Sequence, residues 1–344
     1  MQPFKPFYND WLNVSALFDN SNYQKDYDVP LYMDCNIDFF DNLKFTNKAL
    51  KKYRIDAVNK CAEILGDNIA LTLSGGVDSQ CMVQAFAESD VKFDVYTLVF
   101  NHDLNLQDVS SARHFCKVNK IKLHEIPIDI VRFLSFENYE YGVKYQSASP
   151  HFNTHYKLYN MLLEMGYSGV CSGGYPVVRN NNIYGINFRK NELNFINYTN
   201  VSKFPCIGNF LSFTPELSWV ICLLTEDRYL EDDSKKISYI NHIQQKIDND
   251  KTYQLKNNGY KRSGFKIIPQ EEKYTGFERV KKYFENITND PLEFEKRFRY
   301  PLEKIIKPSN RSRFVISDEI YNKLNSIYNK NIVPSVNASA GVTN

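Results

Sequence analysis

The hexapeptide Ser74-Gly75-Gly76-Val77-Asp78-Ser79 combines residue types that bind a phosphate group. Two adjacent glycines let the backbone turn sharply and approach an anion closely. Successive backbone N–H groups can then converge on the phosphate, and the N-terminus of a following helix adds about half a positive charge. The hydroxyls of Ser74 and Ser79 are further hydrogen-bond donors. We therefore expect residues 73–79, which begin at Leu73 and include Val77, to bind the phosphates of a nucleotide.

Asp78 is the unexpected member of this segment, because a carboxylate repels phosphate. Carboxylates do hold Mg²⁺, however, and a bound magnesium ion bridges phosphate oxygens. We therefore predict that Asp78 is a metal ligand and a catalytic residue. The alternative is a glycine-rich turn in which Asp78 and the serines only cap a helix. The position of the hexapeptide between an apolar strand and an amphipathic helix favours the phosphate site.

Two other phosphate-binding motifs are absent from the chain. No G-x-x-x-x-G-K-[ST] sequence occurs, so the hexapeptide is not a Walker P-loop. No G-x-G-x-x-G sequence occurs either, which excludes the usual dinucleotide-binding fingerprint.

Alternating strand and helix patterns surround the hexapeptide. The apolar patterns predict strands at 69–73, 93–100, 122–126 and 169–172, and helices at 46–65, 79–89, 107–119, 129–137 and 153–165. This alternation predicts an α/β fold with a doubly wound parallel sheet. Ligands of such folds bind at the carboxyl ends of the strands, which is where the hexapeptide lies.

The remaining segments divide the chain into four predicted regions. Residues 1–45 are expected to be an irregular N-terminal extension, and 46–200 the α/β domain that carries the hexapeptide. Residues 201–335 are expected to form a mostly helical part that completes the active site, followed by a flexible tail at 336–344. We expect a hairpin from 183–188 and 193–198. Helices are predicted from Thr214, as N-cap residue before Pro215, and over 235–248.

The composition is that of a globular protein in a reducing compartment. The chain has 344 residues, a formal net charge of +2 and seven cysteines, and no C-x-x-C pair occurs. Zinc-ribbon, iron–sulfur and thioredoxin-like sites are therefore not expected. No apolar run is long enough to span a membrane, and no signal peptide is apparent. We expect a cytoplasmic protein, and the sequence gives no indication of its oligomeric state.

Residues 71–79 closely resemble the phosphate loop of the PP-loop, or N-type, ATP pyrophosphatases, and the chain is most similar to the synthetase domain of asparagine synthase-type enzymes. The resemblance covers about residues 45–285 in separate pieces. It implies an adenine nucleotide alpha-hydrolase-like fold with ATP and Mg²⁺ as cofactors. By position in the family, it implies adenine contacts from Val99 and Phe100, a second glycine-rich loop with Gly173 and Gly174, and a catalytic lysine at Lys273.

This chain departs from the family in two places. The second loop of the family carries an Asp-Glu pair that helps to bind Mg²⁺, whereas residues 172–176 contain no carboxylate. The glutaminase domain of asparagine synthetases is also absent, and residue 2 is a glutamine instead of a cysteine nucleophile. Asp78 is therefore the one metal ligand that we predict, and nitrogen would come from free ammonia, an amine substrate or a separate partner protein.

The resemblance implies attack of a substrate oxygen on the α-phosphate of ATP, release of pyrophosphate and transfer of the adenylated small-molecule substrate to ammonia or an amine. Two other enzyme classes stay open, namely tRNA thiolation and synthesis of a modified base or deazapurine. The paired or clustered cysteines that those classes commonly use are missing, but a nucleic-acid partner is not excluded. A third alternative is a module that binds ATP without cleaving it.

Several further residues have a functional and a structural interpretation. His151 and His155 are spaced to share one helix face, and they could line a polar pocket, bind a metal with a third ligand, or only lie at the surface or cap the helix. Asp108 is either a helix cap or a site residue. Arg179 and Lys251 are weaker candidates for the role of Lys273.

Overall fold

The structure is a computed structural model that describes residues 11–13, 29–180, 183–186, 188–225, 257–270, 276–306, 312–314 and 316–339. Its central feature is a five-stranded sheet in the order β5-β4-β3-β6-β9, with parallel pairing throughout. The strands are β3 (Ile69–Thr72), β4 (Phe93–Phe100), β5 (Leu123–Ile128), β6 (Gly169–Ser172) and β9 (Cys206–Ile207). The predicted parallel sheet is therefore confirmed, and β9 is an additional edge strand that the sequence did not reveal.

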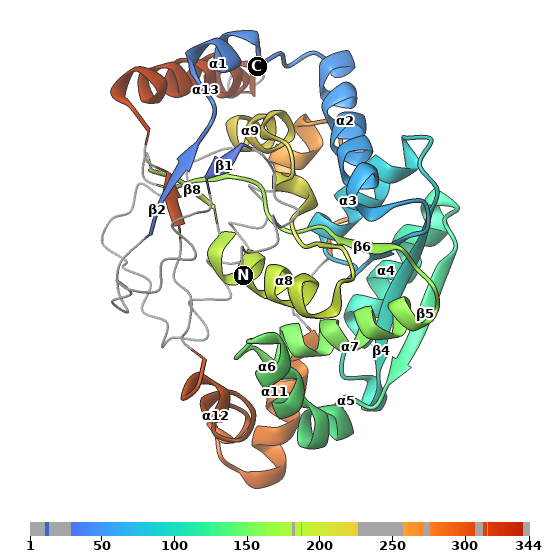
Figure 1. Cartoon of the computed structure of the whole chain (residues 1–344). Helices are drawn as coiled ribbons and strands as arrows, with labels where there is room; N and C mark the ends of the chain where they lie inside the picture. Colours follow the sequence, from blue (N-terminus) through green and yellow to red (C-terminus); the bar gives the residue numbers. More distant parts are fainter. Residues whose placement is uncertain are drawn as a thin grey trace.

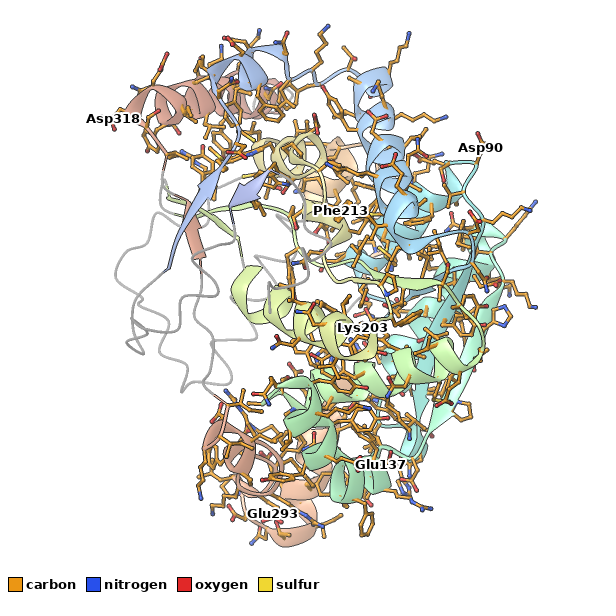
Figure 2. The ribbon with its side chains drawn as sticks, viewed as in Figure 1. Asp90, Glu137, Lys203, Phe213, Glu293 and Asp318 are labelled. Carbon is orange, nitrogen blue, oxygen red and sulfur yellow. The ribbon has the colours of Figure 1, made fainter. Side chains whose placement is uncertain are left out.

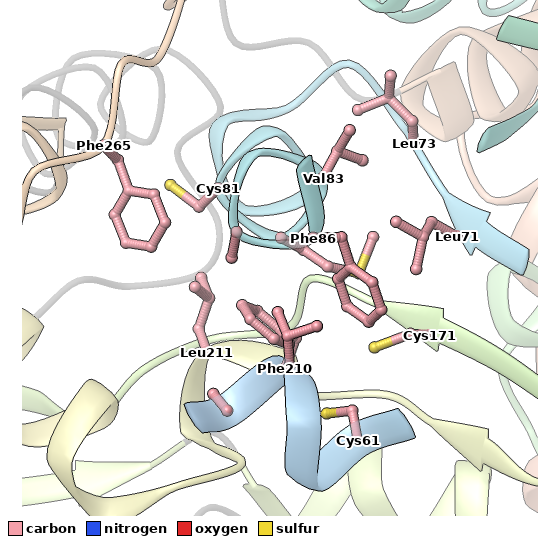
Figure 3. Close-up of a cluster of buried hydrophobic side chains, with 14 of the residues drawn as sticks. Cys61, Leu71, Leu73, Cys81, Val83, Phe86, Cys171, Phe210, Leu211 and Phe265 are labelled. Atoms are coloured by element: carbon pink, nitrogen blue, oxygen red, sulfur yellow. The ribbon is translucent and has the colours of Figure 1, made fainter. Parts of the chain in front are cut away.

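Helices cover both faces of this sheet, because alternate strand residues point to opposite sides. One face packs against α2 (Asn47–Leu65), α3 (Val77–Ala87) and α4 (Leu106–Asn119) through Ile69 and Leu71. The other face carries Ala70 and packs against α7 (Pro150–Glu164), α8 (Phe188–Ser202) and α11 (Gly276–Thr288). Figure 3 shows the first of these two cores around α3. Burial on both faces explains why the strands are continuous apolar runs in the sequence.

A group of short helices extends the second face, at the bottom of Figure 1. The predicted helix at 129–137 is in fact α5 (Ile130–Arg132) followed by a π-helical turn (Phe133–Glu137), and the chain continues directly into α6 (Asn138–Tyr145). A second π-helical turn (Glu295–Arg299) precedes α12 (Tyr300–Glu303). Glu137 and Glu293 mark this region in Figure 2.

A second, mixed sheet was not predicted. Its order is β1 (Leu12–Asn13), β2 (Val29–Met33), β10 (Ser312–Phe314), β8 (Ile183–Ile186) and β7 (Val178–Asn180). The prediction of a hairpin from 183–188 and 193–198 is wrong, since β8 pairs with β7 and residues 193–198 lie in α8. The N-terminal region also contains regular structure, namely β2 and the helix α1 (Ile37–Asn42).

A helix from the N-terminal region and the last helix of the described chain pack together beside this sheet. Helix α13 (Asp318–Ser339) lies next to α1, as Figure 1 shows, and extends into the segment expected as a tail. Both contact a third core around α9 (Pro215–Leu224), in which Trp219 is fully buried with its ring 5.3 Å from that of Phe40. The helix predicted after Thr214 is confirmed. The helix predicted at 235–248 lies outside the described residues.

Candidate nucleotide and metal site

The loop after β3 turns at a single glycine. The ladder between β3 and β4 continues one residue past the strand, where the Leu73 N–H donates to the Tyr96 carbonyl at 2.8 Å. Gly75 then adopts φ +79°, a left-handed conformation that side chains disfavour. Gly76 has φ −71° and is the N-cap residue of α3. The expectation that both glycines supply conformational freedom is therefore corrected, because Gly75 alone needs it.

Hydroxyl groups fix the shape of this loop from within. The Ser79 hydroxyl donates to the Gly76 carbonyl at 2.8 Å, and the hydroxyl oxygens of Ser74 and Ser79 lie 3.2 Å apart. The Gly76 N–H points to the Ser74 hydroxyl at 3.4 Å. Ser79 is buried, whereas Ser74 is exposed. Ser74 is thus the better placed of the two serines to donate to a phosphate.

Helix α4 packs directly against Gly75. A Cβ atom at Gly75 would lie 2.3 Å from the Asp108 carbonyl oxygen, and the Ser111 hydroxyl donates to the Gly75 carbonyl at 2.9 Å. Asp108 is in the first turn of α4, so this candidate residue does lie beside the phosphate loop. Ser111 was not anticipated, although it is three residues from Asp108 on the same helix.

A buried amide connects the loop to the C-terminal half of the chain. The Gln80 side chain is fully buried, and its nitrogen donates to the carbonyls of Gly75 and Ile268, each at 2.8 Å. Its oxygen accepts the Ile268 N–H at 2.8 Å. One turn later the Gln84 oxygen accepts the Lys266 N–H at 2.7 Å. A glutamine directly after the hexapeptide was the sequence signal for this connection, and it was missed.

The second glycine-rich loop meets the first at Asp78. Strands β3 and β6 are neighbours with Thr72 opposite Ser172, so both loops leave the same edge of the sheet. A Cβ atom at Gly173 would lie 2.6 Å from the Asp78 carbonyl oxygen. The next residue, Gly174, packs equally closely against Asn209. Gly173 therefore lies where the two loops meet, whereas Gly174 lies against Asn209, two residues after β9.

Two tyrosines surround the Asp78 carboxylate. The fully buried Tyr260 hydroxyl donates a hydrogen bond to Asp78 Oδ1. Burial, together with the Asp78 charge, raises the pKa of Tyr260 well above its usual value. Loss of hydration and the same charge raise the pKa of Tyr175 to about 12. Both phenols therefore stay protonated at neutral pH and remain hydrogen-bond donors.

The residues around Asp78 fit a magnesium ion that a nucleotide brings with it. Across the described ranges, no group of three or more His, Cys, Asp and Glu side chains is placed to hold a metal ion. Mg²⁺ usually takes one or two carboxylates and completes its octahedron with phosphate oxygens and water. One carboxylate beside a loop predicted to bind phosphate matches that pattern, whereas the described residues form no all-protein metal cage.

The end of β4 forms an aromatic edge beside the loop. The Asn105 side chain fixes this strand end by accepting the Phe100 N–H and donating to the Leu98 carbonyl, each at 2.8 Å. The Phe100 ring lies 6.3 Å from that of Phe277 at the start of α11. Val99 and Phe100 lie at the end of β4, the strand next to β3. Adenine contacts from these two residues remain a prediction.

A pocket of about 700 Å³ opens at the ends of β4 and β5. Its lining consists of Asn101, His102, Asp129, Val131, Arg132, Ser135, Phe136 and Glu137. None of residues 73–79 lines it, so this pocket is separate from the loop after β3.

The two histidines of α7 lead from the surface towards the end of β6. Their rings are 4.5 Å apart, and the ring of His155 lies 6.1 Å from that of Tyr159, whose hydroxyl is 3.1 Å from the Ser172 hydroxyl. Burial is the main cause that lowers the pKa of His155 well below its usual value, and the charge of His151 lowers it further. No group of three metal ligands includes them among the described residues, and a role in lining a pocket remains a prediction.

Of the three basic candidates, Arg179 alone lies within the described residues. The Arg179 guanidinium donates to the Asn325 side chain at 3.1 Å and lies 4.3 Å from the centre of the Tyr328 ring, so it packs on α13. Lys251 and Lys273 lie outside the described residues, and the role of Lys273 remains a prediction.

When the chain is compared with known proteins, similarity is found to solved structures but not to family models or curated proteins. No protein-family model matches the chain, and no curated protein matches it. The glutamine-dependent NAD+ synthetase from Acinetobacter baumannii, in complex with ADP, is similar over 38% of this chain and 26% of its own, with 16% identity and a TM-score of 0.30. The chain thus spans about a quarter of that protein.

Two further solved structures are similar over longer stretches. The U34-tRNA thiolase NcsA from Methanococcus maripaludis, with its [4Fe-4S] cluster, matches 76% of this chain and 80% of its own, with 14% identity and a TM-score of 0.29. The NMN synthetase from Francisella tularensis matches 66% and 99%, with 14% identity and a TM-score of 0.31. Sequence identities and TM-scores this low carry no argument about this chain. Its α/β fold is established by the strand order of its own parallel sheet.

Proposed function

We propose that this protein is an ATP-using enzyme of the pyrophosphatase type, which binds Mg²⁺-ATP at residues 73–79 and cleaves the bond between the α- and β-phosphates. One observation carries the proposal: the loops after β3 and β6 meet at Asp78, at the carboxyl edge of a parallel sheet. Anionic ligands of such sheets bind at this edge. The resemblance of residues 71–79 to the phosphate loop of PP-loop ATP pyrophosphatases supports the same conclusion.

Catalysis at this loop would be mainly electrostatic. Backbone N–H groups at the start of α3 and the Ser74 hydroxyl would bind the phosphates, and the helix dipole favours their negative charge. Asp78 would hold the magnesium ion, which neutralises charge on the phosphates when bound. These groups would stabilise the charge that develops as pyrophosphate leaves, with Lys273 contributing a further positive charge.

The substrate oxygen that attacks the α-phosphate would become adenylated. We infer that ammonia or an amine then displaces AMP, as in asparagine synthase-type reactions, with nitrogen supplied from a separate source. Adenylation converts a poor leaving group into a good one. The neutral, partly buried His155 and its neighbour His151 offer a polar wall near the end of β6 for the substrate.

A tRNA or nucleobase modification enzyme is the second candidate. All seven cysteines are buried, and none of them forms a disulfide. Burial raises the pKa of Cys116 to about 11 and that of Cys35, with help from the Glu216 charge, to about 12. Such thiols are poor nucleophiles, so a sulfur-transfer role for them is disfavoured.

The proposal is tested by the products formed from ATP. Purified protein is incubated with Mg²⁺, α-labelled ATP and a pool of small-molecule acceptors, and AMP and pyrophosphate are expected. Release of ADP and phosphate would exclude α,β-bond cleavage. ATP binding with no turnover under any acceptor would favour the non-catalytic module.

The variant Asp78→Asn should lose turnover while keeping its fold, because the amide is a far weaker ligand for Mg²⁺ than the carboxylate. The matched control is Asp90→Asn, at an exposed aspartate in the turn before β4. The control should keep full activity. Retained activity in Asp78→Asn would remove this residue from the mechanism.

A further inference from the structure

The contact between Tyr260 and Asp78 joins segments 182 residues apart in the sequence. Tyr260 lies in a helical turn of the segment 257–268, and its side chain is fully buried. A buried phenol hydroxyl needs a hydrogen-bond partner to avoid a large cost in free energy. Its partner here is the one carboxylate of the phosphate loop, so the contact is directed at the candidate metal ligand.

The segment 257–268 is held firmly enough to fix the direction of this hydroxyl. Gln80 bonds both backbone groups of Ile268, and Gln84 bonds the N–H of Lys266. From α2, the Arg54 guanidinium donates to the Ser263 carbonyl at 2.8 Å. Figure 3 shows Phe265 of the same segment facing Cys81 of α3. These contacts, at three to eight residues after Tyr260, anchor the segment that carries its ring.

Asp78 is thereby held at two points. The second loop packs against its backbone through Gly173, and the Tyr260 hydroxyl holds its side chain at Oδ1. Carboxylates that bind metals are themselves usually hydrogen-bonded, and loss of such a partner typically weakens metal affinity or activity 10–100-fold. The second loop offers no carboxylate of its own, so the orientation of Asp78 matters more.

We propose that Tyr260 is a positioning residue for Asp78, whose hydroxyl orients the carboxylate to bind Mg²⁺ together with ATP. This inference rests on the proposed function. If Tyr260 has this role, the segment 257–268 contributes to metal binding through the contact between Tyr260 and Asp78.

The test is Mg²⁺-dependent binding of an ATP analogue that cannot be cleaved between the α- and β-phosphates, measured by calorimetry over a range of Mg²⁺ concentrations. Tyr260→Phe removes the hydroxyl alone. We expect its apparent Mg²⁺ affinity to fall about 10–100-fold, with Mg²⁺-free binding of the analogue changed less than about twofold. In an Asp78→Asn background, the same substitution should cause no further loss of Mg²⁺ affinity.

The matched control is Tyr198→Phe, at a fully buried tyrosine whose hydroxyl donates to Asn160 at 2.9 Å, in the other core. It should leave the Mg²⁺ dependence unchanged, even if it lowers the melting temperature as much as Tyr260→Phe does. A wild-type Mg²⁺ dependence in Tyr260→Phe would overturn the role of Tyr260 alone. Failure of the wild-type protein to bind the analogue would overturn this inference and the proposed function together.

Discussion

At the scale of single residues, the two glycines of the phosphate loop differ in what a methyl group would do. At Gly75 a Cβ atom meets the backbone of α4 at 2.3 Å, and the backbone has φ +79°. At Gly76 the nearest atom to a Cβ would be the Ser74 hydroxyl oxygen at 3.5 Å, an ordinary contact. Their sequence positions are adjacent, but the fold requires glycine at Gly75 alone.

We therefore expect Gly75→Ala to lower the free energy of unfolding by more than about 1 kcal/mol, since alanine at positive φ is strained and here also collides with backbone. Gly76→Ala should keep the melting temperature near that of the wild type and weaken ATP binding, because its methyl group occupies the phosphate side of the loop. Thermal unfolding with and without Mg²⁺-ATP measures both effects. An equal loss of melting temperature in the two variants would contradict this assignment.

The lowered pKa of His155 predicts a loss of stability in acid. Below the usual pKa of histidine, near 6.5, the unfolded chain binds a proton that the folded chain excludes, so stability falls as the pH drops from about 7 to 5. His155→Gln should reduce this pH-dependent loss, whatever its effect at neutral pH. Melting temperatures at pH 7.5, 6 and 5 provide the measurement. The exposed His114→Gln is the control and should keep the full acid loss.

At the scale of elements, α3 connects the parallel sheet to the segment 257–268, which contacts α3 across 188 residues of sequence. Gln80 and Gln84 lie one turn apart on α3, and their amides bond the backbone of Ile268 and Lys266 as a neighbouring strand would. The loop carbonyl of Gly75 shares the same amide nitrogen. Helix, loop and C-terminal segment therefore form one hydrogen-bonded unit around the candidate site.

Replacement of Gln80 by leucine should destabilise this unit. The substitution leaves the N–H and carbonyl of the half-buried Ile268 without their side-chain partner, which costs about 1–3 kcal/mol per buried group, whereas the Gly75 carbonyl keeps the Ser111 hydroxyl. Amide hydrogen exchange should accelerate in residues 257–268 and at the start of α4, while β4 and β5 serve as the internal reference. Unchanged exchange at Ile268 would show that the segment is held by its apolar contacts alone.

Helices and strands could be predicted from the sequence where a local pattern of apolar residues determines them. Strands β4 and β6 have their predicted bounds, because each is a short apolar run between polar turns. Residues 193–198 read as a strand but form a helix, since packing of Phe195 and Tyr198 in the second core decides their conformation. The mixed sheet pairs Leu31 with Phe314, and no local pattern reveals such a partner.

The candidate site also contains residues that could be predicted from local sequence and residues that could not. Residues 73–79, with Gly173 and Gly174, could be recognised because their chemistry lies within short continuous segments. Tyr260 could not, because a lone tyrosine carries no signal of a partner 182 residues away. Tertiary contacts of this kind become visible only after the chain has folded.

At the scale of the whole molecule, burial of every thiol makes cysteine reactivity a measure of folding. All seven cysteines are buried, and they are spread over both faces of the parallel sheet and the third core. Burial disfavours the thiolate, which is the reactive form. We expect a thiol reagent such as DTNB to modify the native protein very slowly at pH 8 and to titrate seven thiols in denaturant. Rapid modification of one thiol in the native state would identify a locally opening region.

The long separation between α3 and its partners has a consequence during protein synthesis. At about 5–20 residues per second, Ile268 leaves the ribosome about 10–40 s after Gln80, since 188 residues separate them. For nearly all of that interval Gln80 lacks Ile268 as its partner, and Asp78 lacks the Tyr260 hydroxyl. Contacts of such high sequence separation also form slowly in refolding. Nucleotide-binding competence should therefore appear late, after the parallel sheet itself has assembled.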